Sequence, residues 1–82
     1  MQTNSQKTSI VYSQEYCSAC TAAKRLLHIN GYEVEERKIG VGNQWTKKDL
    51  IEAVPDAKSV PQVFINGEYI GGFRELSAFL VK

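Results

Sequence analysis

The sequence predicts an α/β domain with a mixed four-stranded sheet and three helices, in the order β-α-β-α-β-β-α. Four short segments rich in β-branched, aromatic or alternating apolar residues indicate strands, and three segments with helical apolar spacing indicate helices. Asn66-Gly67, the strongest two-residue signal for a β-hairpin, joins the last two strands. A right-handed crossover makes the first two strands parallel and the hairpin makes the last two antiparallel, with helices on both faces.

The first half of the chain has the pattern of a β-α-β unit. Residues 8–12 are rich in β-branched and aromatic side chains, which favours a buried strand, and a loop over residues 13–16 follows. From residue 19 to an Asn-Gly stop after residue 29, one helical face is apolar and the other is charged. Residues 32–39 then alternate apolar with charged side chains, as a second strand would.

The second helix is predicted from its ends. Thr46, with Asp49 three residues later, has the pattern of a capping box for a short helix that runs through about Val54. Pro55 prevents the helix from continuing. Trp45, just before this helix, is expected to be a packing anchor, and the alternative is that it shapes a ligand groove.

The last third of the chain contains the hairpin and a final helix. Residues 62–65 and 68–70 are short apolar-rich strands on either side of the Asn-Gly turn. A helix over about residues 74–81 is expected to turn its apolar side chains toward the sheet. These side chains are Leu76, Phe79 and Leu80.

Length and charge limit what the chain can be. At 82 residues it can bury one modest core, so we expect a polar tail over residues 1–7 and a single domain over residues 8–82. Charged residues make up 23% of the chain and nearly cancel, to +1, so no strong field favours nucleic acid or an anionic membrane. The first residues lack the apolar stretch of a secretory signal, and no run reaches the length of a membrane span. We expect a cytoplasmic monomer.

Cys17 and Cys20, the only two cysteines, stand between the first strand and the first helix. One closely spaced pair of cysteines is more typical of catalysis or metal binding than of a disulfide that only stabilises the fold. A helix that starts at or just after Cys17 favours a thiolate there, and the thiolate is the nucleophile in disulfide exchange. The alternatives are an inert buried pair and half of a zinc site. His28, the only histidine, would lie roughly 16 Å along the helix from Cys17, too far to share a metal ion.

Four blocks of sequence follow one another along the chain. They are Val11-Tyr12-Ser13, the cysteine pair, Ser59-Val60-Pro61-Gln62-Val63-Phe64-Ile65 and Ile70-Gly71-Gly72-Phe73. In this order they resemble the glutaredoxin branch of the thioredoxin fold, most closely the compact bacterial or bacteriophage glutaredoxins. The resemblance covers nearly the whole chain and implies a thioredoxin-like fold and a thiol–disulfide oxidoreductase.

The resemblance implies a role for each cysteine. Cys17 would be the attacking thiolate, and Cys20 would resolve the mixed disulfide that the attack produces. It also implies a cis peptide bond between Val60 and Pro61, which would present the Val60 backbone to an extended peptide such as glutathione. Without the resemblance, a proline there could simply start an edge strand.

The resemblance further implies a glutathione site. The γ-glutamyl end would lie at the start of the last helix, where backbone N–H groups suit a carboxylate. Lys48 stands where relatives often carry a basic or amide side chain near the glycyl carboxylate. The implied glutathione-binding residues are Gln14, Lys48, Ser59, Val60, Pro61, Gly72, Phe73 and Arg74. Glutathione would be the reductant, and no metal is expected.

The chain departs from the usual family pattern around the cysteines and the last helix. Ser18 and Ala19 replace the proline and tyrosine of the common Cys-Pro-Tyr-Cys centre, which removes the tyrosine contact with glutathione and makes Ser18 a candidate helix cap. Gln14 is neutral where many relatives carry lysine. Arg74 stands where an acidic or small residue is usual.

The resemblance therefore implies a glutathione-dependent enzyme that reduces protein disulfides and protein–glutathione mixed disulfides, with ribonucleotide reductase as a client by family analogy. Two alternatives are open. Gln14, Ala19 and Phe73-Arg74 motivate a redoxin of the same fold that thioredoxin reductase reduces. Ser18 motivates a [2Fe–2S] carrier in which two chains each supply Cys17 and two glutathiones supply the other thiolates.

Overall fold

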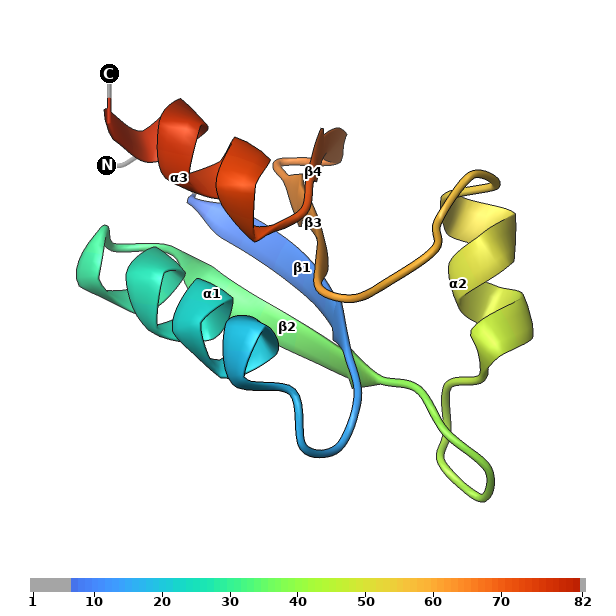
Figure 1. Cartoon of the computed structure of the whole chain (residues 1–82). Coiled ribbons are helices and arrows are strands. Elements are labelled where there is room, and N and C mark those ends of the chain that lie inside the picture. Colours follow the sequence, from blue (N-terminus) through green and yellow to red (C-terminus); the bar gives the residue numbers. More distant parts are fainter. Residues whose placement is uncertain (1–6, 82) are drawn as a thin grey trace, which may run out of the picture.

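A computed structural model describes residues 7–81 of the chain (Figure 1). Four strands and three helices follow one another in the predicted order. The strands are β1 (Thr8–Ser13), β2 (Glu33–Lys38), β3 (Gln62–Ile65) and β4 (Glu68–Gly71), and the helices are α1 (Ser18–Ile29), α2 (Lys47–Ala53) and α3 (Phe73–Val81). The predicted element order is confirmed. Apart from its last residue, the predicted tail lies outside the described residues.

The sheet has the strand order β2-β1-β3-β4 and is mixed, as predicted. β1 runs parallel to β2 and antiparallel to β3, and β4 pairs antiparallel with β3. α1 and α3 lie on one face of the sheet and α2 lies on the other (Figure 1). β1 is therefore a central strand, and the loop that follows it leads directly to the cysteines.

One part of the core lies between the sheet and the two helices α1 and α3. Val11, Leu27 and Leu76 are fully buried there, one from each of β1, α1 and α3. Leu80 packs against this cluster, but Phe79 is 39% exposed, so the expectation that it turns toward the sheet is wrong. At about 100° per residue, Leu76 and Leu80 share a helical face, whereas Phe79 lies about 100° away from Leu80.

The second part of the core lies under α2 and centres on an aromatic contact. Tyr12 and Trp45 form a T-shaped pair with a centroid distance of 6.5 Å, and the Arg37 guanidinium lies 4.3 Å from the centre of the Trp45 ring. Arg37 also donates a 2.8 Å hydrogen bond to the Tyr12 hydroxyl. Trp45 is thus the packing anchor that the sequence predicts, and it holds the start of α2 against the sheet.

Two local signals in the sequence give the structures they predict. The Asp49 N–H donates to Thr46 Oγ1 at 3.3 Å and the Thr46 N–H donates to Asp49 Oδ2 at 2.8 Å, which completes the capping box. Asn66 and Gly67 have φ values of 50° and 85°, the pair of left-handed conformations that a tight hairpin requires. Within residues 7–81, no helix has the length and apolar character needed to cross a membrane.

Leu27 provides a test of the core under α1. Because its side chain is fully buried, we expect Leu27→Ala to lower the free energy of unfolding by about 2–5 kcal/mol in urea titrations. Ile29→Ala, in the same helix but 73% exposed, should change it by less than about 0.5 kcal/mol. Equal losses for the two variants would contradict this packing.

Candidate active site

Cys17 is the N-cap residue of α1. Its backbone is extended, with φ of −117° and ψ of 99°, and its Sγ accepts a 3.1 Å hydrogen bond from the Cys20 N–H. The cap is therefore Cys17 itself, and the expectation that Ser18 caps the helix is wrong, because Ser18 is already the first helical residue. A sulfur in this position receives a backbone donor and the favourable end of the helix dipole, both of which stabilise a thiolate.

The two cysteines form a disulfide and differ in their exposure to solvent. Cys17 is half-buried, whereas Cys20 is only 2% exposed. An external sulfur can therefore reach Cys17 but not Cys20. This difference matches the roles of attacking and resolving thiol that the resemblance implies.

The turn before β3 lies opposite the disulfide. The Val60–Pro61 peptide bond is cis, as the resemblance implies, and the Val60 carbonyl oxygen is 3.9 Å from Cys17 Sγ. A Cβ added to Gly72 would lie 3.4 Å from the Pro61 carbonyl oxygen, so the start of α3 packs closely against this turn. The backbone of Val60 thus lies beside Cys17 Sγ, and the first turn of α3 packs against the same turn.

A pocket of about 300 Å³ lies on the α2 side of this turn. Three of the expected glutathione-binding residues line it together, Gln14, Ser59 and Val60. Its lysines are Lys47 and Lys58, and Lys48 is not among the lining residues. A helix turns by about 100° per residue, so the adjacent lysines Lys47 and Lys48 point to different faces of α2.

Three more of the expected residues, Gly72, Phe73 and Arg74, lie at the start of α3. Gly72 precedes the helix, and its N–H donates a 2.9 Å hydrogen bond to Glu75 Oε1. Glu75 was not anticipated, although an acidic residue three positions after a helix cap is a recognisable sequence signal. Because glycine has no side chain to accept hydrogen bonds, Gly72 cannot cap the N–H groups of Phe73 and Arg74 at this helix start.

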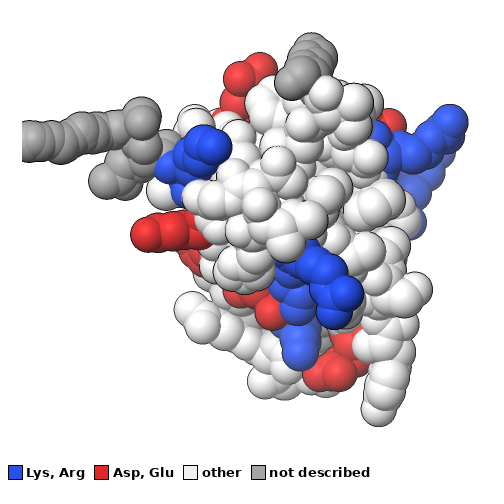
Figure 2. Space-filling view, turned by 90° about the vertical axis from the view of Figure 1, so that its left-hand side faces the viewer, with Lys and Arg blue, Asp and Glu red and all other residues white. Residues whose placement is uncertain are grey.

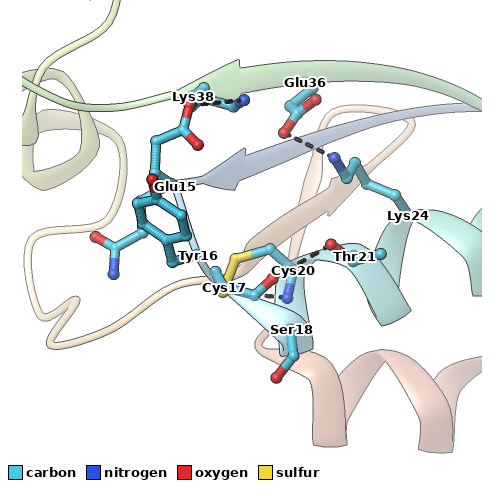
Figure 3. Close-up of a pocket in the computed structure, with 10 residues that line it drawn as sticks. Glu15, Tyr16, Cys17, Ser18, Cys20, Thr21, Lys24, Glu36 and Lys38 are labelled. Atoms are coloured by element: carbon cyan, nitrogen blue, oxygen red, sulfur yellow. Dashed lines mark hydrogen bonds and ion pairs between the residues drawn. A yellow bond between two sulfur atoms is a disulfide. The ribbon is translucent and has the colours of Figure 1, made fainter.

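A second pocket, of about 420 Å³, lies on the β2 side of the disulfide. Figure 3 shows the cysteines along one edge and two ion pairs along the opposite edge, Lys24 with Glu36 at 2.8 Å and Lys38 with Glu15 at 3.3 Å. Sequence reasoning missed this charged wall. The one available signal was that Lys24 follows Cys20 by four residues and so shares its helical face.

Glu36 is the most strongly held carboxylate in this wall. The hydrogen bond from Lys24 lowers the pKa of Glu36 below its ordinary value of 4.5, and a 2.6 Å hydrogen bond from the buried Ser13 hydroxyl lowers it further, against a smaller opposing effect of burial. Glu36 therefore stays ionised at neutral pH and keeps the Lys24 ammonium beside the pocket.

The charge on the face that Figure 2 presents does not single out another site. Figure 2 shows positive and negative side chains interspersed among larger uncharged areas on the face it presents. Among residues 7–81, no three His, Cys, Asp or Glu side chains lie close enough together to hold a metal ion. A cluster shared between two chains would draw one Cys17 from each chain, so this observation does not bear on it.

The arrangement is suited to two-step thiol–disulfide exchange. Cys17 can attack an external disulfide from the pocket side, and Cys20 lies within the same helical turn, where it can displace the bound sulfur. Val60 offers backbone groups to whatever is attached to that sulfur.

Comparisons with known proteins agree with this geometry. Residues 10–70 match the family model described as Glutaredoxin. The chain is 35% identical over 74 residues to human mitochondrial glutaredoxin-2, covering 87% of this chain and 44% of that protein, and 32% identical over 71 residues to a glutaredoxin of Neisseria meningitidis, covering 85% and 81%. It thus spans less than half the length of the mitochondrial relative.

Two solved structures are also similar. Glutaredoxin 1 from Francisella tularensis, complexed with cacodylate, has a TM-score of 0.73 and 26% identity, covering 93% of this chain and 99% of that chain. The buckwheat glutaredoxin–glutathione complex has a TM-score of 0.68 and 25% identity, covering 92% of this chain and 69% of that chain.

Glu36 predicts how stability depends on acid. Its pKa is lower in the folded state than in the unfolded chain, so its contribution is complete above the ordinary value of 4.5 and is lost as the pH falls through the folded-state value. We expect Glu36→Gln to be less stable than the parent at pH 7, by up to about 1 kcal/mol, and to converge with it in acid. Glu33→Gln, on the same strand, is the control. Parallel acid unfolding curves for Glu36→Gln and the parent would contradict the assignment.

Proposed function

The chain belongs to the glutaredoxin family of thiol–disulfide oxidoreductases, and we propose that it is a dithiol glutaredoxin that uses glutathione to reduce protein disulfides and protein–glutathione mixed disulfides. The observation that carries the proposal is the position of Cys17. Its sulfur is at the N-terminus of α1, accepts the Cys20 N–H, and lies 3.9 Å from the Val60 carbonyl oxygen. These contacts put a stabilised nucleophile beside backbone that can hold a peptide thiol.

In the proposed reaction, the Cys17 thiolate attacks one sulfur of the client disulfide. A bond forms between Cys17 Sγ and that sulfur, and the other client sulfur leaves as a thiolate. Cys20 then loses its proton and attacks Cys17 Sγ, which releases the reduced client and leaves the Cys17–Cys20 disulfide. Two glutathione molecules reduce this disulfide in turn and become glutathione disulfide.

Three features support glutathione as the reductant. The pocket beside Val60 is lined by Lys47 and Lys58, cations suited to the glycyl carboxylate. The backbone N–H groups at the start of α3 suit the γ-glutamyl carboxylate. A structurally similar buckwheat protein was solved as a complex with glutathione. Ribonucleotide reductase as a client and a cytoplasmic location are further parts of the proposal, supported by the family resemblance and the cysteine content.

The choice of reductant is the decisive test. We expect turnover of a glutathionylated peptide when the protein is supplied with glutathione, glutathione reductase and NADPH, followed as NADPH consumption. Thioredoxin reductase and NADPH should support little turnover of the same protein. Activity with thioredoxin reductase alone would instead favour the redoxin of the same fold, and no NADPH consumption in either mixture would overturn the proposal.

The two cysteines provide matched controls for that assay. Cys17→Ser should abolish reduction of every substrate because it removes the nucleophile. Cys20→Ser should lose protein-disulfide reduction while still turning over glutathionylated peptide, since a second glutathione can replace the resolving thiol. A Cys20→Ser variant that reduced protein disulfides like the parent would contradict the resolving role.

Lys47 and Lys48 form a matched pair for the glutathione pocket. Lys47 lines the pocket and Lys48 does not, so we expect Lys47→Gln to raise the KM for a glutathionylated peptide about threefold with little change in kcat, the size typical of a solvent-exposed ion pair. Lys48→Gln should leave both constants close to those of the parent. Equal effects of the two substitutions, measured by steady-state kinetics, would argue against glycyl carboxylate binding at Lys47.

A further inference from the structure

Cys20 faces a different electrostatic environment from Cys17. The backbone N–H of Cys20, in the first turn of α1, donates its hydrogen bond to Cys17 Sγ. The Cys20 side chain itself is almost completely buried, and burial disfavours a thiolate at Cys20. Cys20 must nevertheless become a thiolate twice in a cycle. It loses its proton before it resolves a mixed disulfide, and it receives the electron pair of the S–S bond when the disulfide is reduced.

In the pocket on the β2 side, Cys20 lies among charged side chains. Four charged residues line this pocket with Cys20, one from the loop after β1, one from α1 and two from β2. They are Glu15, Lys24, Glu36 and Lys38. Their formal charges cancel, so the effect on Cys20 depends on which charge is held nearest to its sulfur.

Lys24 is the cation of this pocket whose position the fold restrains most. It follows Cys20 by four residues in α1, which places the two side chains one above the other on a single helical face. Its ammonium is held by Glu36, and Glu36 is held by the hydroxyl of fully buried Ser13. In contrast, both members of the Lys38–Glu15 pair are more exposed, and the distance between Lys38 Nζ and Glu15 Oε2 is longer, at 3.3 Å.

We propose that Lys24 is a functional residue of the disulfide-exchange reaction, where its charge stabilises the thiolate of Cys20, with Glu36 and Ser13 as residues that position it. Cys20 lines this pocket, which opens to solvent, so its proton leaves by way of the pocket as the thiolate forms. The thiolate then donates its electron pair to a new bond with Cys17 Sγ, and the bond between Cys17 and the client sulfur breaks. The client leaves reduced, and the protein is left oxidised.

The inference rests on the proposed dithiol chemistry, and the test separates the two. Fully reduced protein is mixed with excess dithiodipyridine, a neutral disulfide on which a change in protein charge has little direct effect, and release of thiopyridone is followed by absorbance. The first release reports attack by Cys17 and depends on reagent concentration. The second reports displacement by Cys20 and does not depend on it.

We expect Lys24→Met to slow the second release about threefold near neutral pH, as for loss of one partly screened charge, and to slow the first release by a smaller factor, because Cys17 lines the same pocket. The deficit should shrink at higher pH, where the Cys20 thiol ionises without help. Lys24→Arg keeps the charge and should restore the rate. Arg25→Met, which removes an exposed charge from the next position of α1, should have no effect.

Each other outcome has a definite meaning. A second release in Lys24→Met that equals the parent rate throughout the pH range would overturn the role of Lys24 and leave the dithiol function intact. A Lys24→Arg variant as slow as Lys24→Met would also overturn it, because a purely structural contact would then explain the loss. If the parent showed no second release, the dithiol function and this inference would both fail.

Discussion

The hydrogen bond from the Cys20 N–H to Cys17 Sγ is the interaction on which the site depends. It satisfies a backbone donor that α1 would otherwise leave free, so the same contact that begins the helix also stabilises the attacking sulfur. The contact forms in this place because Leu27 and Ala23 hold α1 against the sheet, with its N-terminus at the end of the central strand β1. Packing far from the cysteines therefore sets the environment of Cys17.

The disulfide separates two pockets with different physical character. On the α2 side, lysines and apolar side chains surround the backbone of Val60, and the lining includes no acidic residue. On the β2 side, cations and carboxylates are paired with one another around Cys20. The first arrangement is suited to holding an anionic peptide thiol against Cys17. The second keeps charge near Cys20 without attracting a ligand of one sign.

The α2 side is formed by contacts between segments that lie far apart in the chain. Arg37 of β2 stacks on Trp45 and donates to the Tyr12 hydroxyl, which fixes the loop before α2. That loop determines which face of α2 turns toward Val60, and hence that Lys47 lines the pocket. A charged strand residue that looks solvent-facing in the sequence thus helps to position a lysine of this pocket.

The sequence by itself determined the elements, their order and the identity of the reactive pair. The Asn66-Gly67 turn and the Thr46–Asp49 capping box each form from contacts within a few residues. The contact between Cys17 and Cys20 likewise requires only that a helix begins at Cys17. Local sequence was therefore sufficient to predict all three. Only the tertiary structure decided that Lys47 lines the pocket, that Phe79 is exposed, and that Lys24, Glu36 and Ser13 form a wall beside Cys20. The first two outcomes depend on how each helix is rotated about its axis, and an offset of one residue turns a side chain to a different face of the helix. The third depends on contacts between strands and helices that lie far apart in the chain, about which local sequence patterns carry no information.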